Sequence, residues 1–119
     1  MQKIIAEARH AYKSAEGDVR SIRIYLRAPY DLNEGGTWGC YCHVEGLLEK
    51  ERRVYGEGSI QALCLALHYL RINLRYYEAQ GGTYYYAGDI SIPTKAEDLF
   101  GDKISMPESW KCEATPRRD

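Results

Sequence analysis

The sequence predicts an α+β domain with two layers: an antiparallel sheet of four to five strands, with one long helix packed on one face. Three observations predict this fold. Residues 59–80 have helical periodicity, residues 19–28 and 37–47 alternate apolar and polar side chains, and glycine-rich breaks separate these segments. A helix and a sheet that each have an apolar side bury it by packing together, which gives the two layers.

The segment 59–80 is predicted to be the helix that organises the core. Ser59 is the predicted N-cap, and Gly81 and Gly82 follow the last turn, where a glycine can take the left-handed conformation. Nearly all of the helix is apolar or small, so we expect most of its circumference to be covered. Its one narrow polar stripe consists of Gln61, His68, Arg71, Arg75 and Glu78.

Small side chains on this helix predict how it meets the sheet. At about 100° per residue, Ala62, Ala66 and Asn73 lie between two stripes of large residues. We therefore expect the small residues to face the sheet, while the large ones wrap over the sides of the helix. The two stripes are Ile60, Leu63, Leu67, Leu70, Leu74 and Tyr77, and Leu65, Tyr69, Ile72 and Tyr76.

The other elements follow from alternation and from turn residues. The predicted strands are 19–28, 37–47, 48–55 and 83–87. Residues 4–13 alternate weakly and include poor strand formers, so a strand and a short helix both stay open there. Residues 29–36 are a predicted loop, in which two glycines turn the chain. After Gly88 the apolar residues are scattered, which predicts an irregular segment lying over the domain.

Length and composition indicate one folded domain over residues 1–119. The chain is long enough for a modest core, and 45% apolar with 28% charged residues is ordinary globular usage. Residues 1–93 are the predicted core of the domain. Residues 94–119 are a predicted irregular C-terminal segment whose last residues are frayed.

Charge and hydropathy exclude several classes of protein. The net charge is −1, so the chain lacks the broad positive field of nucleic-acid-binding proteins. No apolar run approaches membrane-spanning length, and no signal peptide is recognisable. Without a secretory context, we expect free thiols in a reducing cytosol at Cys40, Cys42, Cys64 and Cys112. The sequence therefore predicts a cytoplasmic protein with no nucleic-acid or membrane partner.

No set of residues carries a catalytic or metal-binding signature. Strand alternation places Cys40 and Cys42 on the core face and His43 on the opposite face, so the three cannot bind one metal ion. Cys64 and His68 are one helical turn apart, but a nucleophilic thiol also needs an orienting group and an oxyanion site. Phosphate-loop and dinucleotide patterns are absent. We predict no catalytic residue, no cofactor and no metal.

The sheet face away from the helix is the predicted binding surface. The chain has eleven tyrosines against one phenylalanine, and tyrosine and arginine are enriched where proteins bind each other. The same pattern also fits cross-strand tyrosine–arginine packing on a solvated face, and this alternative stays open. The predicted partner-binding residues are Arg23, Tyr25, Arg27, Tyr41 and His43.

The middle of the chain resembles a family of small bacterial proteins known only as a domain of unknown function. The resemblance rests on W-x-C from Trp38 to Cys40, and on R-x-x-G-x-x-S-x-Q-A-L-x-L-A-L from Arg53 to Leu67. It covers roughly residues 5–93, and it implies a bacterial origin and one domain without assigning any catalytic residue. In size and architecture the chain also resembles, more loosely, small α+β immunity proteins that neutralise a toxin domain.

Three functional hypotheses follow. The leading one is a non-enzymatic binding protein with a protein partner, of the immunity or antitoxin type. The second is a small enzyme or ligand-binding domain, with a site where the loop 31–36 meets the chain near Asp89, and with His43 or His68 beside a carboxylate. The third is a structural homodimer that pairs open sheet faces or edge strands.

Overall fold

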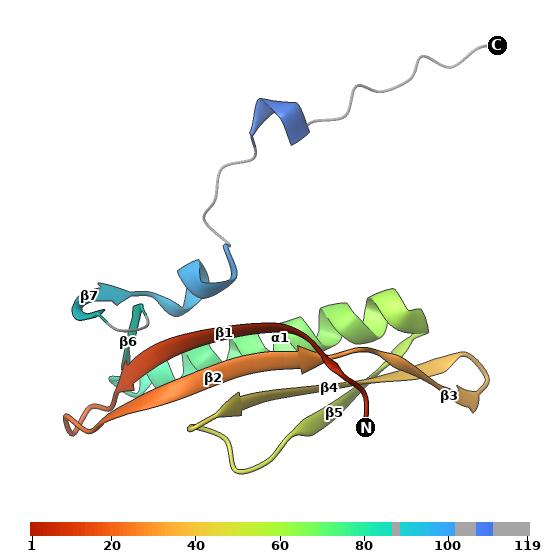
Figure 1. Ribbon diagram of the computed structural model, residues 1–119, viewed down its shortest axis with the longest axis horizontal. Coiled ribbons are helices and arrows are strands. Elements are labelled where there is room, and N and C mark those ends of the chain that lie inside the picture. The colour runs from red at the N-terminus through yellow and green to blue at the C-terminus, as the bar shows by residue number, and fades with distance from the viewer. Residues whose placement is uncertain (87–88, 102–106, 111–119) are drawn as a thin grey trace.

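One antiparallel sheet and one long helix across its face build the fold (Figure 1). The computed structural model describes residues 1–86, 89–101 and 107–110. The strands are β1 (Ile4–Lys13), β2 (Val19–Arg27), β3 (Tyr30–Glu34), β4 (Thr37–Glu45), β5 (Arg52–Glu57), β6 (Thr83–Tyr86) and β7 (Asp89–Thr94). The helices are α1 (Gly58–Ala79) and two short 3₁₀ helices, η1 (Ala96–Phe100) and η2 (Glu108–Trp110).

Within the described residues the sheet has seven strands, more than the four to five predicted. Residues 4–13 form a strand, because β1 pairs with β2 along its length. The predicted loop 29–36 contains β3: Gly35 and Gly36 both have positive φ, and they make a two-residue hairpin turn that returns the chain as β4. β7 lies in the segment predicted to be irregular, where it pairs with β6.

All strand pairs are antiparallel, and β4 is paired on both sides. On one side β4 pairs with β5. On the other side it pairs with β3 near its start and with β2 near its end, and the sheet continues through β1 and β6 to β7. β5 and β7 are therefore the outermost strands at the two sides of the sheet.

The core lies between the sheet and α1, on the predicted faces of both. Alternate residues of β2 and β4 point toward the helix, and Ala62, Ala66, Leu70 and Leu74 of α1 point toward the sheet. Tyr84 of β6 is also fully buried, and its hydroxyl donates a hydrogen bond to the Leu74 carbonyl over 2.7 Å. The buried sheet residues are Ile22, Ile24, Leu26, Cys40, Cys42 and Val44.

The close approach of α1 to β5 depends on glycine as well as on alanine. A Cβ atom at Gly56 would lie 2.4 Å from the backbone nitrogen of Ala62, so only glycine fits there. Ala62 and Ala66 have no exposed area, as predicted. The prediction for Asn73 is wrong: Asn73 is half-buried and bonds the Tyr69 carbonyl, while the larger Leu70 and Leu74 continue the buried line.

The prediction that most of α1 is covered is also wrong. Ile60, Leu65, Ile72 and Tyr76 are exposed, because among the described residues no further layer lies beyond the helix. Ser59 is not the N-cap: Glu57 holds that position and the helix begins at Gly58. At the other end Gly81 has a φ of +97°, which confirms the predicted glycine stop.

The segment after β7 covers part of the domain through η1. Ala96 is buried, and Leu99 and Phe100 pack on the core. Two residues of the predicted polar stripe hold η1: Glu78 accepts a hydrogen bond from the Ala96 nitrogen over 2.8 Å, and the Arg71 guanidinium lies 5.2 Å from the Phe100 ring centroid. Ile90, Ile92 and Trp110 are exposed, whereas Ile104 and Met106 lie outside the described residues.

Candidate functional site

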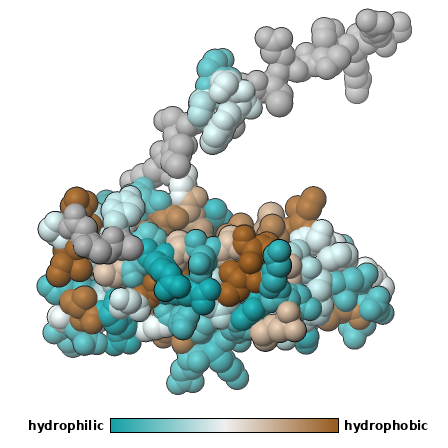
Figure 2. All heavy atoms as spheres, viewed as in Figure 1, coloured by the Kyte–Doolittle hydropathy of each residue, from teal (hydrophilic) through white to brown (hydrophobic). Residues whose placement is uncertain are grey.

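The sheet face opposite α1 carries the residues predicted to bind a partner. In Figure 1 this face lies in front of α1, and Figure 2 shows hydrophilic side chains over much of it, with apolar ones scattered among them. We call the sheet face opposite α1 the open face; its residues are Glu7, Arg9, Arg23, Tyr25, Arg27, Tyr30, Tyr41, His43, Glu45, Arg53 and Tyr55.

No helix of the described residues is both long and apolar enough to cross a membrane.

The centre of the open face is closed over by its own side chains. Tyr25 is 6% exposed and His43 is 8% exposed, and their rings meet edge to face with centroids 5.7 Å apart. The guanidinium groups of Arg23 and Arg27 lie 5.0 and 5.4 Å from the centroid of the Tyr25 ring. Tyr25 and His43 therefore form the floor of this surface, and their predicted contact with a partner stays a prediction.

Glu51, just before β5, ties this centre together. The Tyr25 hydroxyl and the Arg27 Nε, at 2.8 Å, both donate hydrogen bonds to Glu51 Oε1. The side chains of Arg27 and Glu51 are 19% and 18% exposed. Burial alone would raise the pKa of Glu51, but the hydrogen bonds from Tyr25 and Arg27 and the charge of Arg27 lower it below its ordinary value. Glu51 is thus held as a carboxylate.

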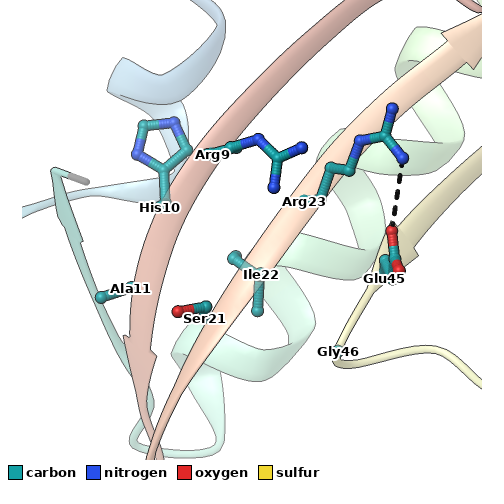
Figure 3. Close-up of a pocket in the computed structure, with 8 residues that line it drawn as sticks. All are labelled: Arg9, His10, Ala11, Ser21, Ile22, Arg23, Glu45 and Gly46. Carbon is teal, nitrogen blue, oxygen red and sulfur yellow. Dashed lines mark ion pairs between the residues drawn. The ribbon is translucent and has the colours of Figure 1, made fainter. Parts of the chain in front are cut away.

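A shallow trough of about 390 Å³ lies at one end of the open face (Figure 3). Arg9 and Arg23 stand directly opposite each other on β1 and β2. Like charges in this position repel, but Arg23 Nε lies 2.5 Å from Glu7 and its Nη1 lies 3.6 Å from Glu45. The acids of this end are therefore already paired within the chain.

The other end of the open face is a tyrosine–arginine cluster, made of Tyr30, Tyr41, Arg53 and Tyr55. Arg53 donates hydrogen bonds to the Tyr30 hydroxyl over 2.8 Å and to the Tyr55 hydroxyl over 2.8 and 2.6 Å. The rings of Tyr30 and Tyr41 are stacked, with centroids 6.0 Å apart. Arg53 thereby fixes two aromatic side chains that the sequence distributes over two strands.

Glycine at position 39 lets this cluster lie flat on the sheet. A Cβ atom at Gly39 would be 3.1 Å from Arg53 Cδ and 3.2 Å from the Tyr30 ring. Gly39 stands beside Tyr30 and Tyr55 in the sheet, between β3 and β5. Local sequence patterns do not show this arrangement, because it joins residues of three strands.

The cations of the open face differ in their partners. Arg23 and Arg27 pair with carboxylates, whereas Arg53 bonds only tyrosine hydroxyls within the described part of the chain. Lys50 and Arg52 form no ion pair there, and the Arg52 guanidinium lies on the helix side, 5.2 Å from the Tyr69 ring centroid. Positive charge at β5 is therefore less compensated than at β2.

The cysteines are placed as the strand alternation predicts. Cys40 and Cys42 are buried free thiols in the core, and His43 points to the other face. Burial raises the pKa of Cys42 to about 12, so this thiol stays protonated. Cys64 is a free, exposed thiol, and Cys112 lies outside the described residues. Within the described ranges, no three His, Cys, Asp or Glu side chains gather at a possible metal site.

The site expected for a small enzyme does not form. β3 and the turn after it lie at the β4 side of the sheet, whereas Asp89 begins β7 at the far side. The loop 31–36 and the chain near Asp89 are thus separated by β2, β1 and β6. His43 Nδ1 is buried without a hydrogen-bond partner in the described structure.

A comparison with family models matches residues 8–92 to DUF6968, a domain of unknown function. The match covers more than half of the chain. The chain belongs to the DUF6968 family. The part shared with DUF6968 includes the whole tyrosine–arginine cluster and the central residues of the open face, whereas η1 and η2 lie beyond it. The comparisons with curated proteins and with solved structures gave no match.

Proposed function

We propose that this DUF6968 chain is a non-enzymatic protein-binding module whose contact surface is centred on the tyrosine–arginine cluster. One observation carries the proposal: Arg53, Tyr30 and Tyr55 are held in a fixed, partly exposed arrangement, and no acid of the described residues pairs with Arg53. Tyrosine and arginine are, together with tryptophan, the side chains enriched in binding hot spots.

Preorganisation favours binding at this cluster. Tyrosine has few rotatable bonds, and the hydrogen bonds from Arg53 restrict Tyr30 and Tyr55 before a partner arrives. Less conformational entropy is therefore lost on association. The half of the open face around Arg23 and Arg27 has its charges neutralised internally, so in this proposal it contributes shape more than charge.

A narrower proposal concerns the partner: the chain acts in the bacterial cytoplasm as an immunity or antitoxin-type protein that neutralises a toxin domain. Its support is the loose resemblance in size and architecture, together with the lack of a catalytic set among the described residues. Its test is the neighbouring gene: co-expression of this chain should restore growth to cells that produce the neighbour's product. If growth stays arrested when this chain is co-expressed, the proposal that it neutralises a toxin is refuted.

Affinity capture from cells of the source organism tests protein binding itself. The informative variant is Tyr55→Ser, and Tyr76→Ser is its matched control, because Tyr55 is 49% exposed on the open face and Tyr76 is 57% exposed on α1. A captured protein is then purified and titrated calorimetrically. We expect Tyr55→Ser to weaken its affinity by about tenfold or more, and Tyr76→Ser to leave it unchanged. Recovery of no partner, or equal affinities for both variants, would contradict the proposal.

A further inference from the structure

β5 is an edge strand whose outward backbone groups can be assigned. The Gly58 N–H donates a hydrogen bond to the Gly36 carbonyl over 3.0 Å, directly beyond the Thr37–Glu57 pair of the β4–β5 ladder. Hydrogen-bonded and non-hydrogen-bonded pairs alternate along an antiparallel ladder, so this bond shows which residues of β5 bond to β4. It follows that Arg52, Val54 and Gly56 direct their backbone groups at β4, and that Arg53 and Tyr55 direct theirs away from the sheet.

Glu57 is the next residue expected to direct its N–H away from β4, and its hydrogen bond confirms this assignment. The Glu57 N–H donates to the Gln61 side chain over 2.6 Å rather than to β4. The outward backbone groups of Arg53 and Tyr55 have no such partner within the described part of the chain. Two N–H and two C=O groups therefore face outward in a row at this edge.

Space is available at the same edge. A hollow of about 480 Å³ is lined by Tyr41, Arg53 and Tyr55 on the open face, and by Arg52 and Tyr69 on the helix side. Because its lining comes from both faces of the sheet, the hollow passes around the outer side of β5. Among the described residues no strand occupies this position.

Two other exposed edges of the sheet carry backbone features that hinder strand pairing. β7 carries Pro93, which cannot donate a ladder hydrogen bond. The part of β1 that extends beyond β6 has an irregularity between Ile4 and Ala6, and bulges of this kind disturb further pairing. β5 contains neither device.

Charge identifies what this edge accepts. Lys50, Arg52 and Arg53 all line this hollow, and none of them forms an ion pair in the described structure. The intervening Glu51 is bound by Tyr25 and Arg27. Clustered cations at an edge disfavour pairing with a second copy, since they would bring like charges together. The same cations attract a strand that carries carboxylates.

We propose that β5 binds an extended acidic segment of a partner protein as an additional antiparallel or parallel strand. The backbone of that segment pairs with Arg53 and Tyr55, and its carboxylates meet Lys50, Arg52 and Arg53. Such strand addition takes affinity from the backbone and selectivity from the side chains. The inference rests on the proposed protein-binding function, and it names the chemistry of the partner at the side of the tyrosine–arginine cluster.

The test is a titration of the full chain, labelled with ¹⁵N, with two synthetic six-residue peptides that alternate valine with either glutamate or lysine. We expect the glutamate peptide to bind and the lysine peptide not to bind. The amides of Arg53 and Tyr55 should shift and exchange more slowly with solvent, and added salt should weaken binding. Equal binding of both peptides, or shifts confined to other strands, would overturn the proposal.

Two pairs of variants sharpen the titration. Tyr55→Pro removes one outward N–H while leaving the β4 ladder intact, and Tyr55→Thr keeps that N–H. We expect the proline variant to bind the glutamate peptide about tenfold more weakly than the threonine variant. Reversing charge at β5, with Lys50→Glu and Arg52→Glu, should weaken binding by about tenfold or more, whereas Arg9→Glu with Lys13→Glu should change it little. Equal effects within either pair would refute the inference.

The outcome is separable from that of the proposed function. A captured protein that needs the Tyr55 ring but binds Tyr55→Pro and Tyr55→Thr equally would refute strand addition and leave protein binding intact. If the chain self-associates and Tyr55→Pro abolishes this association, a second copy of the chain occupies the β5 edge. That result would overturn the proposal that an acidic segment of a partner binds there. Binding of the glutamate peptide at β5 without any captured partner would support the inference and contradict the proposed function.

Discussion

Replacing Gly56 by alanine tests how closely α1 lies on the sheet. The added Cβ would be 2.4 Å from the Ala62 nitrogen and 2.8 Å from both the Ala62 Cα and the Gln61 carbonyl carbon. Ordinary van der Waals contact of a Cβ atom begins at 3.4 Å, so the overlap is about 1 Å. All three neighbours are backbone atoms of the helix, and no side-chain rotation can relieve it.

The expected loss follows from that geometry. Overpacking of a filled core costs about 1–3 kcal/mol, and this site belongs at the upper end because the whole first turn of α1 must move. We therefore expect Gly56→Ala to lower the free energy of unfolding by about 3 kcal/mol. For a domain of this size that corresponds to a melting temperature lower by roughly 10–20 °C.

Gly58→Ala is the matched control. Gly58 has a φ of +79°, but an added Cβ would meet no atom within 4 Å. Only the cost of placing alanine in a left-handed backbone conformation, about 1–2 kcal/mol, remains there. Guanidinium denaturation followed by circular dichroism measures both variants. A Gly56→Ala variant that is no less stable than Gly58→Ala would refute the close seating of the helix.

Three further predictions concern stability. Ala66→Asp would place a charge at a site with no exposed area, so we expect no soluble folded protein, as measured by expression and size exclusion; a folded variant would contradict the buried alanine line. Tyr84→Phe removes the hydrogen bond to the Leu74 carbonyl and should cost about 1–2 kcal/mol in denaturant titrations; an unchanged midpoint would contradict it. Because the folded state lowers the pKa of Glu51, its carboxylate stabilises the fold above the unfolded value of about 4.3. The stability difference between wild type and Glu51→Gln should therefore shrink as pH falls from about 6 to about 3; a constant difference would rule this out.

Periodicity predicted the elements whose burial depends on one face. β2, β4 and α1 were found within a few residues of their ends, because alternate or helical apolar positions record which side meets the core. β3 and β7 were missed, since each is short and is recognised as a strand only by its pairing with the neighbouring strand. The turn glycines Gly35 and Gly36 were the available signal for β3, as a pair with positive φ closes a hairpin.

The candidate site was predicted in composition but not in arrangement. Alternation placed Arg23, Tyr25 and His43 on the open face, yet it gave no sign that Tyr25 and His43 are covered. Their cover comes from neighbours on other strands and from Glu51, which is 26 residues from Tyr25 in the chain. Such contacts leave no trace in a local pattern.

The exposed outer side of α1 shows the limit of helical periodicity. A stripe of large apolar residues predicts a covered surface only when a second layer exists to cover it. Leu65, Ile72 and Tyr76 have the spacing of a buried stripe and are exposed, because one sheet meets only one side of the helix. The number of layers is a property of the whole fold.

Amide hydrogen exchange along β5, followed residue by residue by NMR, tests most directly the claim that this strand is a free edge beside the tyrosine–arginine cluster. The structure predicts alternation: the amides of Val54 and Gly56, bonded to β4, are protected, whereas those of Arg53 and Tyr55 exchange fast. Equal protection of all four amides would show that the outer side of β5 is already paired, and would contradict the account.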